Sequence, residues 1–182
     1  MKRFQKKDLF TIPNLICYLR ILLIPVFCVL YAKGEVLWAT GVVLFSSFTD
    51  LFDGLIARKF HQITELGKVL DPVADKLTHG ALAVCLAMRY PLMWVLIALM
   101  AVKEGYMAVM GIRYLQKGKM LDGAMWFGKI CTATLFTGLF VLFLVYDMST
   151  AAANILIVFM MAVMLLTLLM YIPVYRKMKQ EL

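Results

Sequence analysis

The chain has 182 residues, of which 63% are hydrophobic and only 16% are charged, and its formal net charge is +8. Because a soluble domain of this length is nearer half apolar, the composition excludes an ordinary soluble protein and indicates one that is integral to a membrane. The basic residues gather at the ends of apolar segments, a pattern that reflects membrane topology and attraction to anionic lipid or phosphate, so no nucleic-acid partner is expected.

The N-terminal residues 2–11 are basic and amphipathic and suit a short interfacial helix. The apolar run that follows, from Ile12 to Ala32, is longer than the core of a signal peptide and leads into no small-residue cleavage site, so we expect a retained first span. Six apolar segments succeed one another, each near the roughly 20 residues that a spanning helix needs. They are 13–32, 36–58, 66–88, 91–113, 123–146 and 150–174. With short loops and no repeat or long linker, we expect one all-α integral membrane domain, residues 1–182, with six transmembrane helices.

The lysines and arginines between these segments are distributed very unequally between the two sides of the membrane. One side carries 13: Lys2, Arg3, Lys6, Lys7, Arg58, Lys59, Lys68, Arg113, Lys117, Lys119, Arg176, Lys177 and Lys179. The other carries two, Lys33 and Arg89. Because basic residues favour the cytoplasmic side, this predicts a multi-pass protein of the cell (inner) membrane with both termini and the 59–65 loop in the cytoplasm.

The four cysteines all lie in apolar stretches and include no C-x-x-C pair. They are Cys17, Cys28, Cys85 and Cys131. Free cysteine behaves as a small buried hydrophobe, so we expect packing residues and neither a disulfide nor a zinc site.

Four aspartates stand out because they occur inside apolar sequence, where a carboxylate at a helix centre costs roughly 2.5–3.5 kcal/mol. Asp50 and Asp53 are three residues apart and Asp71 and Asp75 are four apart, so each pair shares one helix face. The connecting loop folds the two helices back on each other, and all four carboxylates can then converge near the cytoplasmic headgroups. Solvated carboxylates at helix ends are the plain alternative.

Carboxylate oxygens favour Mg²⁺, Mn²⁺ or Ca²⁺ over zinc, and four of them suit two ions. Two such ions beside a lipid suit phosphoryl transfer, with one carboxylate left to accept a proton. A small cation transporter is an alternative of another class. A transporter would not explain the Gly54, Ala57 and Arg58 that accompany the acids, and its ion site would lie nearer the midplane.

The acidic residues belong to a longer pattern that resembles the signature of the CDP-alcohol phosphatidyltransferase family. The pattern is Asp50-x-x-Asp53-Gly54-x-x-Ala57-Arg58, eight residues, then Gly67-x-x-x-Asp71-x-x-x-Asp75. The resemblance implies a six-helix membrane bundle, usually a homodimer, with two divalent ions (Mg²⁺ or Mn²⁺) held by Asp50, Asp53, Asp71 and Asp75. It also implies that Asp75 is the general base and that Asp50, Gly54, Ala57, Arg58 and Gly67 bind the CDP group.

Within that family the chain is most similar to the phosphatidylglycerophosphate synthases, on Ile12-Pro13-Asn14-Leu15, on Leu19-Arg20-Ile21 and on residues 64–76. The resemblance implies transfer of a phosphatidyl group from CDP-diacylglycerol to sn-glycerol 3-phosphate with release of CMP. The dianionic acceptor needs cationic contacts, for which the candidates are Lys129, Arg113, Lys103 and Arg20. Where those synthases commonly have Arg-Glu-Phe, this chain has Lys103-Glu104-Gly105. The alternative acceptors are phosphatidylglycerol, which would give cardiolipin, then inositol phosphate or serine.

Overall fold

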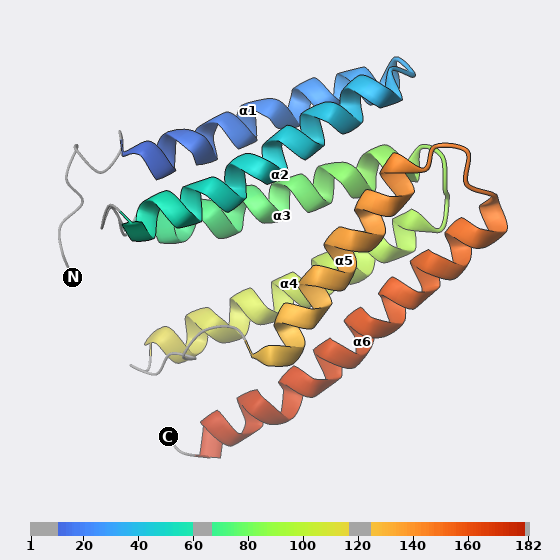
Figure 1. The fold of residues 1–182 in the computed structure, drawn as a ribbon. Helices are drawn as coiled ribbons and strands as arrows, with labels where there is room; N and C mark the ends of the chain where they lie inside the picture. The colour runs from blue at the N-terminus through green and yellow to red at the C-terminus, as the bar shows by residue number, and fades with distance from the viewer. Residues whose placement is uncertain (1–10, 60–66, 117–124, 181–182) are drawn as a thin grey trace. The chain divides into compact units, whose positions relative to one another are not determined.

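The computed structural model describes residues 11–59, 67–116 and 125–180, with side chains at all of these positions except 12–13, 50–59, 68–69, 115 and 177–180. Every regular element in these ranges is an α-helix, as the composition predicts. The six helices of the described residues are α1 (Ile12–Ala32), α2 (Val36–Lys59), α3 (Gly67–Ala87), α4 (Met93–Gln116), α5 (Trp126–Leu144) and α6 (Thr150–Gln180), drawn in Figure 1. The chain divides into two compact units, one ending at Cys85 and the other beginning at Leu86.

In the first unit, α1 and α2 pack side by side and are joined by a tight turn (Figure 1). Gly34 lies in this turn with φ of 80°, in the left-handed region that glycine adopts without steric cost. Its N–H donates to the carbonyl of Tyr31 at 3.0 Å, which closes the turn. The short connection makes α1 and α2 antiparallel neighbours.

Three side-chain contacts join α1 to α3 along their length. They are Cys17 with Asp71, Arg20 with Asp75, and Cys28 with Cys85, whose sulfur atoms are 3.5 Å apart. The residue numbers rise together along both helices, so α1 and α3 run in the same direction. The contacts therefore fix both the register of these helices and the face of α1 that lies toward α3.

In the second unit, α6 packs against both α4 and α5. An aromatic cluster from all three helices forms its core: Tyr114, Phe127, Tyr171 and Tyr175 are buried there. The Tyr114 hydroxyl donates to the carbonyl of Tyr175 at 2.7 Å.

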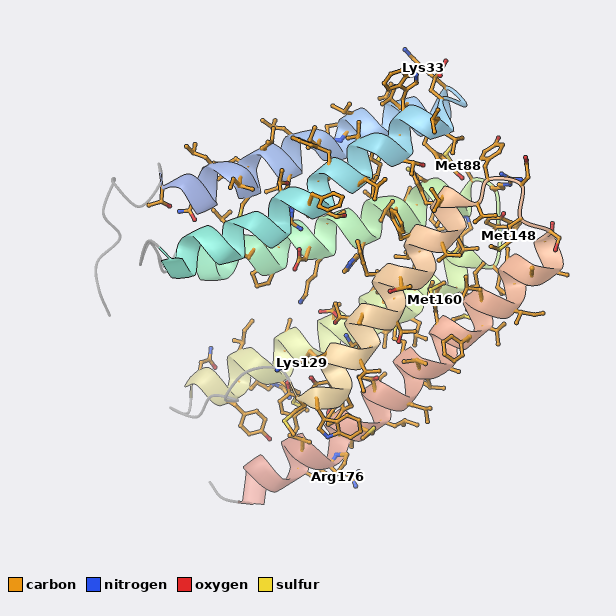
Figure 2. All side chains as sticks on the ribbon, in the orientation of Figure 1. Lys33, Met88, Lys129, Met148, Met160 and Arg176 are labelled. Atoms are coloured by element: carbon orange, nitrogen blue, oxygen red, sulfur yellow. The ribbon has the colours of Figure 1, made fainter. Side chains whose placement is uncertain are left out.

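Two glycines of α5 lie close against α6. A Cβ at Gly128 would collide with the Tyr171 hydroxyl, and one at Gly138 would collide with the sulfur of Met160, which Figure 2 labels. Small residues at these two positions therefore set how closely α5 and α6 approach.

Within the described residues, four helices are long and apolar enough to cross a membrane. These spans are Asn14–Ala32, Met93–Tyr114, Trp126–Leu144 and Thr150–Arg176. Large apolar side chains such as Leu22, Trp94 and Leu166 are exposed on them, as expected of a surface that faces lipid. A membrane protein with several spans is thus supported.

The predicted spans 36–58 and 66–88 correspond to α2 and α3. The side chains of α2 are described only up to Thr49, and this described part, Val36–Thr49, is an apolar stretch shorter than a span. In α3, the charged residues Asp71, Asp75 and Lys76 lower the hydropathy of the helix. Six spans therefore remain a prediction. Residues 2–10 of the predicted interfacial helix lie outside the described residues.

Candidate functional site

The two aspartates of α3 lie on one face of that helix, as their spacing predicts, and α1 provides a polar partner for each. Arg20 is the partner of Asp75, with Nη2 2.5 Å from Oδ1. The Arg20 side chain is 5% exposed whereas that of Asp75 is 44% exposed. A guanidinium and a carboxylate are each costly in an apolar helix, and their pairing lowers the cost of both. The buried guanidinium of Arg20 therefore lies behind the partly exposed carboxylate of Asp75.

The partner of Asp71 is Cys17, one turn before Arg20 on α1. The Cys17 thiol donates to Oδ1 of Asp71 at 2.7 Å, and Cys17 is fully buried. The sequence predicts Cys17 as a packing residue, which its burial confirms, but the apolar pattern around it does not predict the contact with Asp71. Its position three residues before Arg20, on the same helix face, is the signal that could have done so.

The other half of the motif lies in the last three turns of α2. Asp50, Asp53, Gly54, Ala57 and Arg58 are helical there, at the predicted spacing, but their side chains lie outside the described set. Gly67, which begins α3, is buried. The convergence of all four carboxylates therefore stays a prediction.

Among the described side chains, no group of three or more His, Cys, Asp or Glu gathers in one place. Two of the four predicted ligands, Asp50 and Asp53, are not part of that set. The ligand chemistry of the other two is suitable, because Asp71 and Asp75 present hard oxygen donors from one helix face.

The candidate acceptor-binding residues other than Arg20 belong to the second unit. Lys103 is buried in α4, and its Nζ lies 2.8 Å from Oε1 of Glu104. Arg113 is exposed in the last turn of α4. Lys129 is exposed in the first turns of α5, directly after Gly128 (Figure 2). Lys103 is thus neutralised within its own helix, while Arg113 and Lys129 present exposed charges.

Comparison with known proteins gives a family match over nearly the whole chain. Residues 10–173 match the family model described as CDP-alcohol phosphatidyltransferase. This range includes all eight motif positions and all six helices up to Pro173 of α6.

Among similar proteins, a probable phosphatidylglycerophosphate synthase of Mycobacterium tuberculosis is 34% identical over 164 residues, covering 86% of this chain and 76% of that protein. A CDP-diacylglycerol–glycerol-3-phosphate 3-phosphatidyltransferase of Pseudomonas fluorescens is 42% identical over 86 residues, covering 46% of this chain and 44% of that protein. A cardiolipin synthase (CMP-forming)/mitochondrial hydrolase fusion protein of Schizosaccharomyces pombe is 42% identical over 89 residues, covering 49% of this chain and 15% of that protein. The chain thus spans less than two thirds of the last two relatives.

Proposed function

The chain belongs to the CDP-alcohol phosphatidyltransferase family, and from this premise we propose that it transfers the phosphatidyl group of CDP-diacylglycerol to sn-glycerol 3-phosphate, releasing CMP. The observation that carries the proposal is the complete eight-residue motif within the family match. The acceptor is supported by the names of the Mycobacterium and Pseudomonas relatives.

Members of this family generally use divalent metal ions. We propose that Asp50, Asp53, Asp71 and Asp75 hold two such ions, Mg²⁺ or Mn²⁺. When bound, the ions would offset the negative charge that builds up on the pyrophosphate oxygens. The carboxylates of α3 suit this task because they are hard oxygen ligands on one face.

Asp75 is the proposed general base. A hydroxyl oxygen of glycerol 3-phosphate forms a bond to the β-phosphorus of CDP-diacylglycerol, and the bond from that phosphorus to the bridging oxygen breaks. CMP leaves with the bridging oxygen, and the hydroxyl proton passes to Asp75. The partial exposure of Asp75 supports this role, because a base must be reachable by the proton that it accepts.

The CDP group is proposed to lie along the α2 side of the motif, bound by Asp50, Gly54, Ala57, Arg58 and Gly67. Small residues at 54, 57 and 67 let a bulky nucleotide approach the backbone, and Arg58 can form a bidentate contact with phosphate.

The acceptor phosphate is proposed to be bound by basic side chains. Lys129 and Arg113 are the first candidates because both are exposed, and Lys103 and Arg20 come next because each is already paired with a carboxylate. A phosphate dianion would gain most from cations that are not already neutralised.

The proposed cellular arrangement is a single membrane domain, residues 1–182, that forms a homodimer in the cell membrane. It has six spans, an N-terminal interfacial helix, both termini in the cytoplasm and the site at the cytoplasmic side. The 13-to-2 distribution of basic residues supports the orientation. CDP-diacylglycerol would reach the site from the surrounding lipid.

One assay tests the proposal: the purified chain in detergent with CDP-diacylglycerol, Mg²⁺ or Mn²⁺ and one acceptor at a time, with CMP release as the readout. We expect glycerol 3-phosphate to give the fastest release. The similarity to the Schizosaccharomyces pombe protein named as a cardiolipin synthase favours phosphatidylglycerol as the second candidate. Faster CMP release with phosphatidylglycerol would replace the first assignment by the second.

A further inference from the structure

We infer that Cys17 and Arg20 of α1 are positioning residues that hold Asp71 and Asp75 of α3 in the orientation that metal binding and proton transfer need. The roles of Asp71 and Asp75 in metal binding and proton transfer rest on the proposed function. The contacts of these aspartates with Cys17 and Arg20 are observed in the structure. Neither α1 residue is required to touch a substrate.

The geometry of the two helices makes a matched pair of contacts. Cys17 and Arg20 are three residues apart, about 4.5 Å along α1, and Asp71 and Asp75 are four apart, about 6 Å along α3. Because α1 and α3 run in the same direction, the short side chain of Cys17 meets Asp71 and the long side chain of Arg20 covers the remaining offset to Asp75. Both contacts engage Oδ1 of their carboxylate, at 2.7 and 2.5 Å.

The burial of Cys17 and Arg20 argues against direct binding of the acceptor by either residue. Cys17 is fully buried and the Arg20 side chain is 5% exposed, whereas the Asp75 side chain is 44% exposed. A phosphate arriving at the exposed carboxylate would meet Asp75 before it could meet Arg20. Arg20 therefore acts through Asp75.

These contacts restrict the rotamers of the two carboxylates, because a rotation away from Cys17 or Arg20 breaks a hydrogen bond. Removing Asp75 from Arg20 would leave a buried guanidinium without its carboxylate, which is strongly unfavourable. Hydrogen bonds behind a metal ligand fix its orientation, and their loss typically costs about ten- to a hundredfold in metal affinity or activity. We expect effects of this size from the two α1 residues.

The experiment compares Mn²⁺ affinity and steady-state kinetics of the purified full chain and its variants Arg20→Leu, Arg20→Lys, Cys17→Ala and Cys17→Ser. Mn²⁺ affinity is measured without substrate, from the electron paramagnetic resonance signal of free Mn²⁺. The matched controls are Arg176→Leu, an exposed arginine at the end of α6, and Cys28→Ala, a cysteine of α1 that contacts Cys85. Thermal melting shows whether each variant is folded.

For Arg20→Leu we expect Mn²⁺ affinity and kcat to fall about ten- to a hundredfold, while both KM values change less than about threefold. Arg20→Lys keeps the charge and should recover part of the loss. Cys17→Ala should weaken Mn²⁺ binding, and Cys17→Ser, which keeps a donor, should weaken it less. Both controls should match the unmodified chain. If Arg20→Leu does not fold, Arg20→Lys tests the inference instead. This variant should still show a measurable loss of Mn²⁺ affinity, and unchanged affinity would count against the positioning role of Arg20.

Two results would overturn the inference. One is a rise in the KM of glycerol 3-phosphate with unchanged Mn²⁺ affinity and kcat, which would make Arg20 an acceptor ligand. The other is unchanged Mn²⁺ affinity and kcat in folded variants of both residues, which would reduce the contacts to packing. A chain that releases no CMP with any acceptor, but whose Mn²⁺ affinity falls in these variants, would overturn the proposed function and support the positioning role.

Discussion

At the scale of single residues, two buried cations of the described helices each lie against a carboxylate. Arg20 pairs with Asp75 across two helices, and Lys103 pairs with Glu104 on its own helix. An unpaired charge at the centre of a spanning helix costs roughly 2.5–3.5 kcal/mol. Pairing therefore lowers the free-energy cost of both charged groups in each pair. The difference lies in the partner: Asp75 belongs to the family motif and is the proposed general base, whereas Glu104 lies outside that motif.

The metal hypothesis predicts that Asp53→Asn or Asp71→Asn removes most of the activity without unfolding the protein. Asparagine has nearly the same shape as aspartate but lacks the charge that a divalent ion needs. Activity, Mn²⁺ affinity and thermal melting are measured together, with Asp147→Asn, at an exposed position between α5 and α6, as the control. Near-normal turnover in either motif variant would contradict the assignment of two metal ions to this motif.

The acceptor hypothesis predicts that Lys129→Gln raises the KM for glycerol 3-phosphate about tenfold to a hundredfold. A charge-assisted contact with phosphate is worth roughly 1.5–3 kcal/mol, which corresponds to that range. The KM for CDP-diacylglycerol should move far less. Lys33→Gln, at the exposed turn between α1 and α2, is the control (Figure 2). An unchanged acceptor KM would remove Lys129 from the site.

At the scale of helices, the sequence predicts element positions well because apolar length determines them. The segment predicted at 36–58 is α2, Val36–Lys59, and that predicted at 66–88 is α3, Gly67–Ala87. The fourth helix begins at Met93 rather than at Pro91, because hydrogen bonds from Met93 to Tyr90 and from Trp94 to Pro91 form turns first. Apolar length says nothing about turns of this kind.

What the sequence could not give is the rotation of one helix against another. The spacing of Asp71 and Asp75 predicts their common face, but the pairing with Cys17 and Arg20 depends on the register between α1 and α3. Periodicity places a residue on a face of its own helix and leaves the facing residue of the neighbour undetermined. Periodicity alone therefore predicts Cys17 as a packing residue, which its burial confirms, and Arg20 as a candidate acceptor ligand, but it does not predict their contacts with Asp71 and Asp75.

The register of α1 against α3 predicts that Cys28 and Cys85 can be joined by mild oxidation, since their sulfur atoms are 3.5 Å apart. Peptide mapping of the oxidised chain should recover a peptide containing Cys28 linked to one containing Cys85. The Cys28→Ala variant serves as the control and should give no peptide linked to Cys85. A Cys85 peptide linked to Cys17 instead of Cys28 would show that the register is wrong.

The close packing of α5 on α6 predicts that Gly128→Ala destabilises the protein by about 1–3 kcal/mol, because the added methyl group collides with the Tyr171 hydroxyl in a buried cluster. Gly111→Ala is the control: nothing lies near its Cβ position, and alanine stabilises a helix by about 0.5–1 kcal/mol relative to glycine. Thermal unfolding in detergent measures both. Adding Tyr171→Phe to Gly128→Ala should restore part of the stability, and equal melting of the two glycine variants would refute the contact.

At the scale of the whole molecule, the membrane topology depends on whether α2 and α3 cross the membrane. Their lengths, 24 and 21 residues, give about 36 and 32 Å, enough for a hydrocarbon core of about 30 Å. The described part of α2, Val36–Thr49, is apolar, whereas α3 carries Asp71, Asp75 and Lys76. If α2 and α3 span, the 59–65 loop lies on the same side as the N-terminus. If only α1, α4, α5 and α6 span, the end of α1 and the start of α4 lie outside the cell. In that case α2, the 59–65 loop and α3 all stay on the outer side.

Labelling of a single cysteine distinguishes the two topologies. We predict that Gln62→Cys, in a variant whose four native cysteines are serine, reacts with a membrane-impermeant maleimide only when the cytoplasmic face is opened, whereas Asp147→Cys reacts from outside in intact cells. Arg58, Lys59 and Lys68 flank the loop and should keep it in the cytoplasm, whereas Lys33 and Arg89 are the basic residues of the opposite side. Reaction of both cysteines from outside would support four spans. Because α3 carries Asp71 and Asp75, that result would also put the carboxylates on the side away from a cytoplasmic nucleotide, so this measurement tests the membrane placement and the proposed chemistry together.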